Sequence, residues 1–540
     1  MINGDIGSSL LSAARRHADQ PALWALGERR SYRELFEAAA GIAAGLNRIG
    51  VAPGGRVGVL SHRSTTAYTG ILAALLAGCA YVPLNTRFPK ERNRTIAAAA
   101  ECAAIILDDA CAERLDDCLG ELDGELGGDL DRGLILITPE SDAVRLPGRR
   151  RLARGDLGAV ALEHAEVPVG DRGGAAGDDP VYILFTSGTT GAPKGVPISH
   201  ANLAAYLPAI HQHVPLAVGD RVLQAADLTF DLSAHDMFLT WLNGAEPYSV
   251  PENATVLAPR LIAEHRVSAC LLVPSTAARA REQGLLAAGR MPSLRHSLFA
   301  GEALPVTIAE AWQEAAPNSA VFNLYGPTEG TIHVSYFRFD RAAALPSAVV
   351  PIGRPLGRQR MALFAEGSEV ADGQTGEIYL HGPQMTVGYW RAPQLDAEKF
   401  VTIDGVRWYK TGDLGRWTEA HGVLFGGRAD RQVKIRGYRV ELQEIEGVLR
   451  RASGREQVAV IAAPLTADGA ADGCVAFVVG PPSGKGGDGD ALRDACRRAL
   501  PPYMVPSDIV FVTELPLNPN GKTDYKALYR HRAAAGQASV

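Results

Sequence analysis

Short apolar runs alternate with helical segments over the first four hundred residues, and this alternation restricts the chain to a few architectures. Each run is continuously apolar, which is typical of strands that are covered on both faces of a parallel sheet. The runs occupy residues 56–60, 104–107, 181–185, 269–273, 297–300 and 320–324. Alanine-rich and apolar stretches such as 33–46 and 71–76 supply the covering helices. The sequence therefore predicts an α/β fold built from parallel sheets.

Several of these runs lead directly into polar loops that contain glycine. Such loops start at Thr186, Gly301 and Tyr325. Ligands of open α/β sheets bind outside the carboxyl ends of the strands. We therefore expect these three loops to converge on one crevice.

The richest loop follows the strand at 181–185 and contains three glycines, four hydroxyl residues and Lys194. Backbone N–H groups and hydroxyls in such a loop can face a polyanion, and the lysine adds a point charge. Because Lys194 stands between Pro193 and Gly195, the spacing is not that of the P-loop NTPases. The loop predicts a nucleotide triphosphate, and a surface turn is the alternative.

Three further segments offer chemistry that suits the same ligand. In the segment 323–329, Tyr325 can stack on a base, Thr328 can hydrogen-bond a phosphate, and Glu329 can hold Mg²⁺. Asp413, in the segment 408–413, can accept both ribose hydroxyls, or it can form an Asx-type turn. The tail segment 515–522 ends on Lys522, which would be solvated if it acted alone.

Charge and cysteine usage exclude several classes of function. A net charge of −6 and a pI near 6.1 argue against nucleic-acid or membrane-surface binding. The seven cysteines form no C-x-x-C pair, and Cys102, Cys111 and Cys118 lack zinc partners at ligand spacing. We expect reduced thiols in a cytoplasmic protein with no signal peptide and no membrane span.

The character of the chain changes after Arg428. Residues 431–540 combine a basic strand at 432–436, an acidic helix at 441–449 and further short strands. We expect a large N-terminal domain over 1–429 and a small α+β domain over 430–540.

Together these motifs resemble the amino-acid adenylation domains of nonribosomal peptide synthesis, which belong to the adenylate-forming superfamily. The resemblance covers nearly the whole chain and includes residues 32–35, 77–84, 301–302 and 376–378. It implies the adenylate-forming enzyme fold, in which a large domain of αβ-layered sheets precedes a small, mobile α+β lid.

The resemblance also implies a two-step reaction with ATP and Mg²⁺. A carboxylate attacks the α-phosphate of ATP to give an acyl-adenylate and pyrophosphate, and a phosphopantetheine thiol then takes the acyl group. By resemblance, Lys194, Glu329 and Lys522 are catalytic, and Glu329 also holds the metal. The implied ATP-binding residues are Thr186, Ser187, Gly188, Thr189, Thr190, Gly191, Gly301, Glu302, Asn323, Tyr325, Gly326, Thr328, Asp413, Phe425 and Arg428.

The resemblance implies that Asp430 is a hinge about which the small domain rotates between the two steps. Lys522 would bridge the substrate carboxylate and the α-phosphate in the first step, and the rotation would then withdraw it. The loop around Lys434 would approach the site for the second step. An exposed basic strand is the alternative for Lys434 and Arg436.

Asp231 indicates the substrate class, because the family pairs a carboxylate at this position with the substrate's α-ammonium. A buried ammonium is costly to leave unpaired. The alternative is structural, since Asp231 or Ser233 could cap the helix that runs to Trp241. The other pocket residues carried over are Leu232, His235, Leu271, Leu298, Ala300, Leu324, Ile332 and His333.

These mostly large, branched side chains leave a small apolar space. The sequence predicts a small neutral amino acid, with alanine or proline first and glycine or serine next, and a β-amino acid as an alternative. A separate, stand-alone carrier protein is the expected partner, because no carrier segment follows Lys522. The main alternative is an acyl-CoA or aryl-CoA ligase, which Asn85 favours, and a scaffold with a dead site is another.

Overall fold

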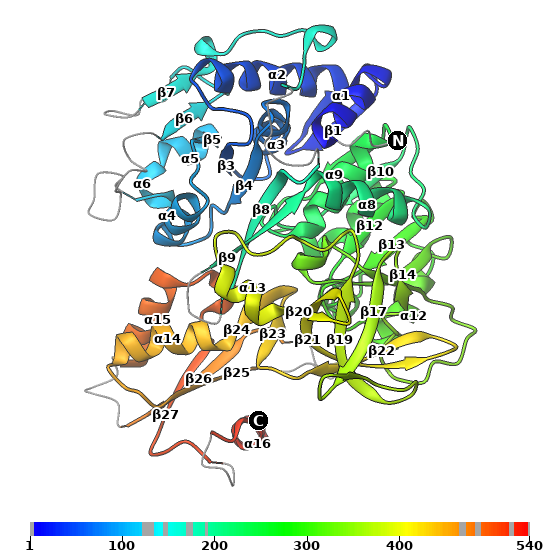
Figure 1. The fold of residues 1–540 in the computed structure, drawn as a ribbon, viewed down its shortest axis with the longest axis vertical. Helices are drawn as coiled ribbons and strands as arrows, with labels where there is room; N and C mark the ends of the chain where they lie inside the picture. Colours follow the sequence, from blue (N-terminus) through cyan, green and yellow to red (C-terminus); the bar gives the residue numbers. More distant parts are fainter. Residues whose placement is uncertain are drawn as a thin grey trace. The chain divides into compact units, whose positions relative to one another are not determined.

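The chain divides into two compact units, whose elements are labelled in Figure 1. The computed structural model describes residues 5–120, 134–143, 150–168, 177–188, 193–463, 471–480, 488–517 and 523–537. Unit 1 comprises Met1–Thr86, Asn93–Phe185 and Gly195–Ala429, and unit 2 comprises Arg87–Arg92, Thr186–Lys194 and Asp430–Val540. The division falls between Ala429 and Asp430, but two short segments from the N-terminal range group with the smaller unit.

A nine-stranded sheet forms one half of unit 1, in the order β16-β15-β14-β13-β12-β10-β11-β1-β2. The six strands from β14 to β1 in this order are parallel, whereas β2, β15 and β16 form antiparallel edges. Its strands are β1 (Pro21–Ala25), β2 (Glu28–Ser31), β10 (Arg221–Gln224), β11 (Glu246–Ser249), β12 (Ala269–Leu272), β13 (His296–Phe299), β14 (Ala320–Tyr325), β15 (Ser335–Arg338) and β16 (Arg354–Pro355).

A seven-stranded sheet forms the other half, in the order β7-β6-β5-β3-β4-β8-β9 (Figure 1). The first six strands in this order are parallel. Its strands are β3 (Arg56–Leu60), β4 (Ala80–Leu84), β5 (Ala104–Leu107), β6 (Ile135–Thr138), β7 (Arg150–Ala153), β8 (Pro180–Thr186) and β9 (Lys194–Ser199). The chain leaves β3 toward β4 on one side, and leaves β5 toward β6 on the other, so the direction of winding reverses between β3 and β5.

A third, antiparallel sheet completes unit 1, in the order β18-β17-β19-β21-β20 with β22 paired to β21. Its strands are β17 (Arg360–Ala365), β18 (Ser368–Glu369), β19 (Thr375–His381), β20 (Phe400–Ile403), β21 (Val406–Thr418) and β22 (Gly422–Arg428).

The helices of unit 1 begin at local signals in the sequence. Ser31 and Glu34 form a capping box at the start of α2, and Asp108 caps α5 by accepting the Cys111 N–H. The helices are α1 (Ile6–Arg16), α2 (Tyr32–Arg48), α3 (Thr65–Leu76), α4 (Lys90–Ala99), α5 (Asp109–Glu113), α6 (Leu115–Cys118), α8 (His200–His211), α9 (Asp231–Leu242), α10 (Ala258–His265), α11 (Pro274–Glu282), α12 (Val306–Ala315) and α13 (Pro393–Lys399). Helix α4 starts in unit 2 and continues into unit 1.

One large apolar cluster joins the two parallel sheets of unit 1. It contains buried side chains of the seven-stranded sheet, such as Ile106, and of the nine-stranded sheet, such as Leu298 and Leu324. Helix α9 packs against β10 and β11 and against α1 and α8. This packing places the first turn of α9 at the carboxyl ends of the parallel strands.

Unit 2 is a small α+β body. A hairpin of β23 and β24 precedes a three-stranded sheet in the order β25-β26-β27. Apolar side chains of α14 and α15, including Ile445 and Leu492, pack on β25 and β26. The elements are β23 (Gln432–Ile435), β24 (Tyr438–Glu441), α14 (Leu442–Ser453), β25 (Val458–Ala462), β26 (Cys474–Val479), α15 (Asp488–Ala499), β27 (Asp508–Val512) and α16 (Tyr525–Gln537).

The predicted strands and helices are confirmed, and most bounds differ by one or two residues, although the helix expected at 441–449 continues to Ser453. All six apolar runs are strands, and the helices expected at 33–46 and 71–76 are α2 and the second half of α3. Much of the segments 119–133, 170–179 and 481–490, whose glycine and aspartate content predicts exposed loops, lies outside the described residues. None of the described helices is both long and apolar enough to cross a membrane.

Candidate active site

The three loops expected to share a crevice leave two different sheets. Gly301 follows β13 and Tyr325 ends the adjacent parallel strand β14, so these loops meet at one edge of the nine-stranded sheet. Thr186 ends β8 of the seven-stranded sheet and belongs to unit 2.

Tyr325, Asp413 and Arg428 form one hydrogen-bonded group, although 88 residues separate the first two. The Tyr325 hydroxyl donates to Asp413 Oδ2 at 2.6 Å. Arg428 lies opposite Asp413 in the ladder between β21 and β22, and its guanidinium forms an ion pair with Asp413 Oδ1. Burial and the Asp413 charge raise the pKa of Tyr325 well above its usual value, so the phenol stays protonated.

This arrangement leaves Asp413 able to hold a diol. An ionised carboxylate offers about four acceptor positions, and these two partners use one on each oxygen. Arg428 also donates to the Thr411 carbonyl at 3.2 Å, and the Asp413 N–H donates to Thr411 Oγ1 at 2.9 Å. These bonds hold Asp413 in a strand, so the Asx-type turn considered from the sequence is wrong.

Asn323, two residues before Tyr325 in β14, offers a buried acceptor. Its Nδ2 donates to the carbonyls of Val350 and Pro351 at 3.0 Å each, which sets the orientation of the amide. Its buried Oδ1 has no hydrogen-bond partner among the described residues. A buried acceptor of this kind is costly to leave unsatisfied, so it suits an N–H donor such as the adenine amino group.

The turn after β14 holds Glu329 in a fully buried position. The Tyr389 hydroxyl donates to Glu329 Oε1 at 2.6 Å. Gly326 is required here, because a Cβ would lie 2.5 Å from the Ile332 carbonyl oxygen. Thr331 and Ile332, at φ of 58° and 70°, adopt the left-handed conformation that branched side chains rarely adopt. Such strain is typical of functional sites.

Glu302 and Phe425 both make contacts that stabilise the fold of unit 1. Both oxygens of Glu302 accept from Ser275, at 2.8 Å from its N–H and 3.1 Å from its hydroxyl, which fixes the first turn of α11. Phe425 lies in β22 opposite Gly415 and packs on the main core. Their roles toward ATP, like those of Gly301 and Thr328, stay predictions.

The glycine-rich loop belongs to unit 2. The Ser187 hydroxyl donates to the Arg439 carbonyl at 2.8 Å, and the buried Thr186 hydroxyl has no hydrogen-bond partner among the described residues. Gly188 and the buried Lys194 flank the segment 189–192. Thr189, Thr190 and Gly191 lie outside the described residues, and so does Lys522.

The residues proposed for the second step begin unit 2. Asp430 is its first residue after unit 1, and its Oδ1 accepts the Gln432 N–H at 3.1 Å. Lys434 lies in β23 opposite Arg439, and Arg436 follows at φ 52° with an ion pair to Asp472. The hinge at Asp430 and the function of Lys434 stay predictions.

Asp231 stands at the start of α9 among three buried tyrosines. Phe230 is the N-cap, and the Ser233 hydroxyl donates to the Phe230 carbonyl, so capping by either Asp231 or Ser233 is wrong. Burial, and after it the Asp231 charge, raises the pKa of each tyrosine. The tyrosines are Tyr81, Tyr182 and Tyr206.

A Tyr–His–His chain forms the polar part of the predicted pocket. The Tyr206 hydroxyl lies 2.7 Å from His235 Nδ1 and 2.9 Å from His333 Nδ1. It donates to one ring and accepts from the other. Burial lowers the pKa of His235 to about 3, and burial with the nearby His235 lowers that of His333 well below its usual value. Both imidazoles are therefore neutral at pH 7.

The apolar pocket residues lie on one face of the nine-stranded sheet. Leu271 pairs with Leu298 in register, and both belong to the large cluster together with Leu324. Phe299, which alternates with Leu298, belongs to the cluster on the opposite face. Leu232, Ala300 and Ile332 are also buried members of the large cluster. Leu271 therefore shares its face of the sheet with Leu298.

Two family models match this chain. The AMP-binding enzyme family matches residues 10–390, and the AMP-binding enzyme C-terminal domain matches residues 444–522. The chain belongs to the AMP-binding enzymes. Its second match covers most of unit 2, and the large α/β unit with a smaller α+β unit is the adenylate-forming fold.

Relatives of this AMP-binding enzyme include a synthase subunit, a carrier-protein ligase and an adenylation domain. It is 34% identical over 527 residues to surfactin synthase subunit 1 of Bacillus subtilis (strain 168), covering 95% of this chain but 14% of that protein. It is 33% identical over 530 residues to an L-proline–[L-prolyl-carrier protein] ligase of Streptomyces coelicolor, covering 95% and 94%. It is 34% identical to the Vibrio cholerae adenylation domain AlmE, solved with glycyl-adenosine-5'-phosphate, with a TM-score of 0.87 and coverage of 99% and 98%.

Three buried polar residues of the AMP-binding enzyme were not predicted from the sequence. Tyr206 lies on α8 and Tyr389 precedes α13, far in sequence from the histidines and the glutamate that they contact. Asp236 is fully buried on α9, and neither of its oxygens has a hydrogen-bond partner among the described residues. An acidic residue directly before the mostly apolar run 237–242 is the one signal that the sequence offered.

Replacing Asp236 by asparagine is expected to stabilise the enzyme increasingly as the pH rises. Burial raises the pKa of this carboxyl well above its usual value, with Arg63 opposing the shift in part. The folded state therefore holds a proton that the unfolded chain loses above about pH 4, which costs about 1.4 kcal/mol for each pH unit. Urea unfolding of Asp236→Asn and the unchanged chain between pH 5 and 8 measures this difference. If the difference in unfolding free energy between Asp236→Asn and the unchanged chain does not vary with pH, the Asp236 carboxyl is not neutral in the folded state.

Proposed function

We propose that this AMP-binding enzyme activates a small neutral amino acid and then loads it onto the phosphopantetheine thiol of a carrier protein. Alanine and proline are the first candidates, and glycine and serine are next. The observation that carries the proposal is the buried Asp231 carboxylate in a pocket whose histidines, His235 and His333, are neutral. The carboxylate suits an ammonium, whereas the neutral rings give no counter-charge to a charged side chain.

The relatives support the same size class. One is named a proline ligase, and another was solved with a glycyl-adenylate. Both amino acids fall within the set predicted from the sequence. The His333 Nε2 atom, which has no hydrogen-bond partner among the described residues, adds serine, because its hydroxyl could satisfy that nitrogen.

In the first step, the residues of unit 1 orient the reactants. Asn323 Oδ1 accepts the adenine amino group, Asp413 accepts the ribose hydroxyls, and Asp231 holds the ammonium so that the substrate carboxylate faces the α-phosphate. Holding both reactants in this way removes much of the entropic barrier. Glu329 would hold Mg²⁺, which prefers oxygen ligands and would neutralise phosphate charge. Lys522 adds a positive charge where the transition state develops negative charge.

In the second step, the carrier thiol attacks the acyl carbon and AMP leaves. Lys522 has no role once the adenylate exists, so its withdrawal by rotation about Asp430 would clear the path of the thiol. Lys434 would then approach from β23. One site would serve both reactions in turn.

An ATP–pyrophosphate exchange panel tests the proposed substrate class. We expect exchange with alanine, proline, glycine or serine that exceeds exchange with propionate or benzoate by more than 100-fold, because the latter lack an ammonium. Neighbouring amino acids that differ by one methylene are expected to differ only about 10–200-fold. Exchange with β-alanine alone would support the β-amino acid alternative. Exchange only with non-amino acids, followed by thioester formation with coenzyme A, would overturn the proposal in favour of a CoA ligase.

A further inference from the structure

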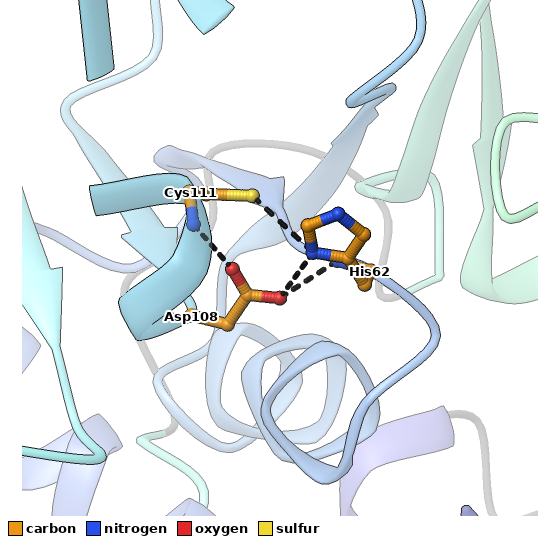
Figure 2. Close-up of side chains that lie close together, drawn as sticks. All are labelled: His62, Asp108 and Cys111. Carbon is orange, nitrogen blue, oxygen red and sulfur yellow. Dashed lines mark hydrogen bonds and ion pairs between the residues drawn. The ribbon is translucent and has the colours of Figure 1, made fainter. Parts of the chain in front are cut away.

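Four metal-binding side chains gather at one edge of the seven-stranded sheet. His62 follows β3 and Asp108 follows β5, while Cys111 lies in α5 and Cys118 ends α6. Figure 2 shows the His62, Asp108 and Cys111 side chains pointing toward one another. None of the four belongs to the proposed ATP or amino-acid site.

The donor atoms have the spacing of ligands around one ion. His62 Nδ1 lies 3.0 Å from Asp108 Oδ2 and 3.8 Å from Cys111 Sγ, and the three atoms lie within 4.8 Å of one another (Figure 2). Ligands of a tetrahedral Zn²⁺ ion stand about 3.4 Å apart for an N–O pair and about 3.6 Å for an N–S pair. Shifts of a few tenths of an ångström would therefore bring both of these pairs to ligand spacing.

Cys118 is a second buried cysteine near Cys111 and would supply a fourth donor. Its sulfur lies outside the group of three donor atoms, so the Cys118 side chain would have to move to complete the site. The set of two sulfurs, one imidazole nitrogen and one carboxylate oxygen suits Zn²⁺, whereas Mg²⁺ and Ca²⁺ prefer oxygen alone.

The carboxylate is already oriented by groups that would remain in place around an ion. Asp108 Oδ2 accepts from the Ser61 hydroxyl at 2.9 Å and from the His62 N–H at 2.8 Å, and Oδ1 accepts from the Cys111 N–H at 2.8 Å. Metal-ligating carboxylates are usually held by such hydrogen bonds. The His62 side chain is 47% exposed, which leaves a route from solvent.

The topology favours a ligand at the same place. The winding of the sheet reverses between β3 and β5, and ligands of open parallel sheets bind outside the carboxyl ends at such a reversal. Leu60 and Leu107 are paired at the ends of these strands, immediately before the segments that carry His62 and Asp108. Two independent observations, donor chemistry and topology, therefore indicate one site.

We propose that His62, Asp108, Cys111 and Cys118 bind one Zn²⁺ ion that joins the β3 loop to α5 and α6. Binding replaces the Nδ1–H···Oδ2 hydrogen bond, so the imidazole proton moves to Nε2. The two thiols lose their protons to solvent and become thiolate ligands. With four protein ligands the ion has no open position, so its role is structural.

Metal titration of the full chain tests this proposal. The protein is stripped with a chelator under reducing conditions and titrated with Zn²⁺ against a chromophoric competitor. We expect one ion per chain, and with Co²⁺ we expect thiolate-to-metal charge-transfer absorption together with tetrahedral visible bands. Cys111→Ser and His62→Ala should each weaken binding by at least about 100-fold, because the loss of a neighbouring hydrogen bond alone costs 10–100-fold. Cys102→Ser, which alters another buried cysteine, should bind like the unchanged chain.

Two further measurements keep the test decisive. Ser61→Ala leaves all four ligands in place and should weaken Zn²⁺ binding about 10–100-fold, even if the ligand variants fail to fold. Thiol counting and mass spectrometry of the chain before reduction detect a Cys111–Cys118 disulfide. Less than a tenth of an ion per chain, a Co²⁺ spectrum without the thiolate band, or equal affinity in Cys111→Ser would overturn the proposal. So would a disulfide that persists under the reducing conditions in which the metal is added.

Discussion

Replacing Lys522 by alanine is expected to slow aminoacyl-adenylate formation about 10²–10³-fold. The reason is that one positive charge placed at the transition state is worth several kcal/mol, as it is for a single oxyanion donor. Its removal should lower kcat in the pyrophosphate exchange much more than it raises KM for ATP, because the interaction belongs to the transition state. Exchange at saturating ATP and amino acid measures the effect.

The same variant should keep the second step. When chemically prepared aminoacyl-adenylate is supplied with a phosphopantetheinylated carrier, transfer by Lys522→Ala should stay within about threefold of normal. Lys526→Ala is the matched control, since it removes the same charge from an exposed position four residues away. Normal exchange in Lys522→Ala would refute a role of Lys522 in the first step. An equal loss of both steps would refute the restriction of that role to the first step.

The parts of this fold that local sequence determines could be predicted. Continuous apolar runs such as Ala104–Leu107 became buried parallel strands, because a strand covered on both faces leaves a local pattern. The segment around Tyr325 combines a strand end, a glycine turn and an acidic residue within seven positions. Its chemistry could therefore be read before any contact was known.

Contacts between distant segments could not be predicted in this way. The Tyr206 hydroxyl links the His235 and His333 rings, although His333 lies 127 residues after Tyr206. No local pattern identifies a tyrosine on an apolar helix as a pocket residue. Cys111 has no zinc partner at ligand spacing in its own segment. In the proposed zinc site one partner is His62, 49 residues earlier, which the parallel pairing of β3 and β5 brings close to Cys111. Ligand spacing along a chain detects sites within a loop or a helix, but not sites that sheet pairing assembles.

The structure also changes what the pocket histidines imply. The sequence alone leaves open whether His235 and His333 carry charge, because an ordinary histidine titrates near neutral pH. Burial keeps both neutral, and their shared Tyr206 hydroxyl fixes complementary tautomers on the two rings. Asp231 is then the pocket residue that we propose to pair with the substrate ammonium, so the proposed substrate class is best tested at this position.

Replacing Asp231 by asparagine is expected to lower kcat/KM for the preferred amino acid about 10²–10³-fold. Asparagine keeps the size of the side chain but removes the negative charge, which leaves the substrate ammonium buried without its partner. Breaking a buried pair in this way costs about 3–5 kcal/mol, and each 1.4 kcal/mol is a factor of ten. The loss should appear in pyrophosphate exchange with the amino acid, while the KM for ATP stays nearly constant.

Two comparisons separate loss of pairing from general damage to the pocket. Asp236→Asn makes the same chemical change five residues along α9, and we expect exchange activity within about threefold of normal because that carboxyl is already neutral. Propionate, which has no ammonium, should react equally poorly with Asp231→Asn and the unchanged enzyme, so the preference for alanine over propionate should collapse. If Asp231→Asn keeps that preference, the carboxylate does not select amino acids and the proposed substrate class fails. If Asp236→Asn loses as much activity as Asp231→Asn, both substitutions act through the packing of α9 rather than through charge.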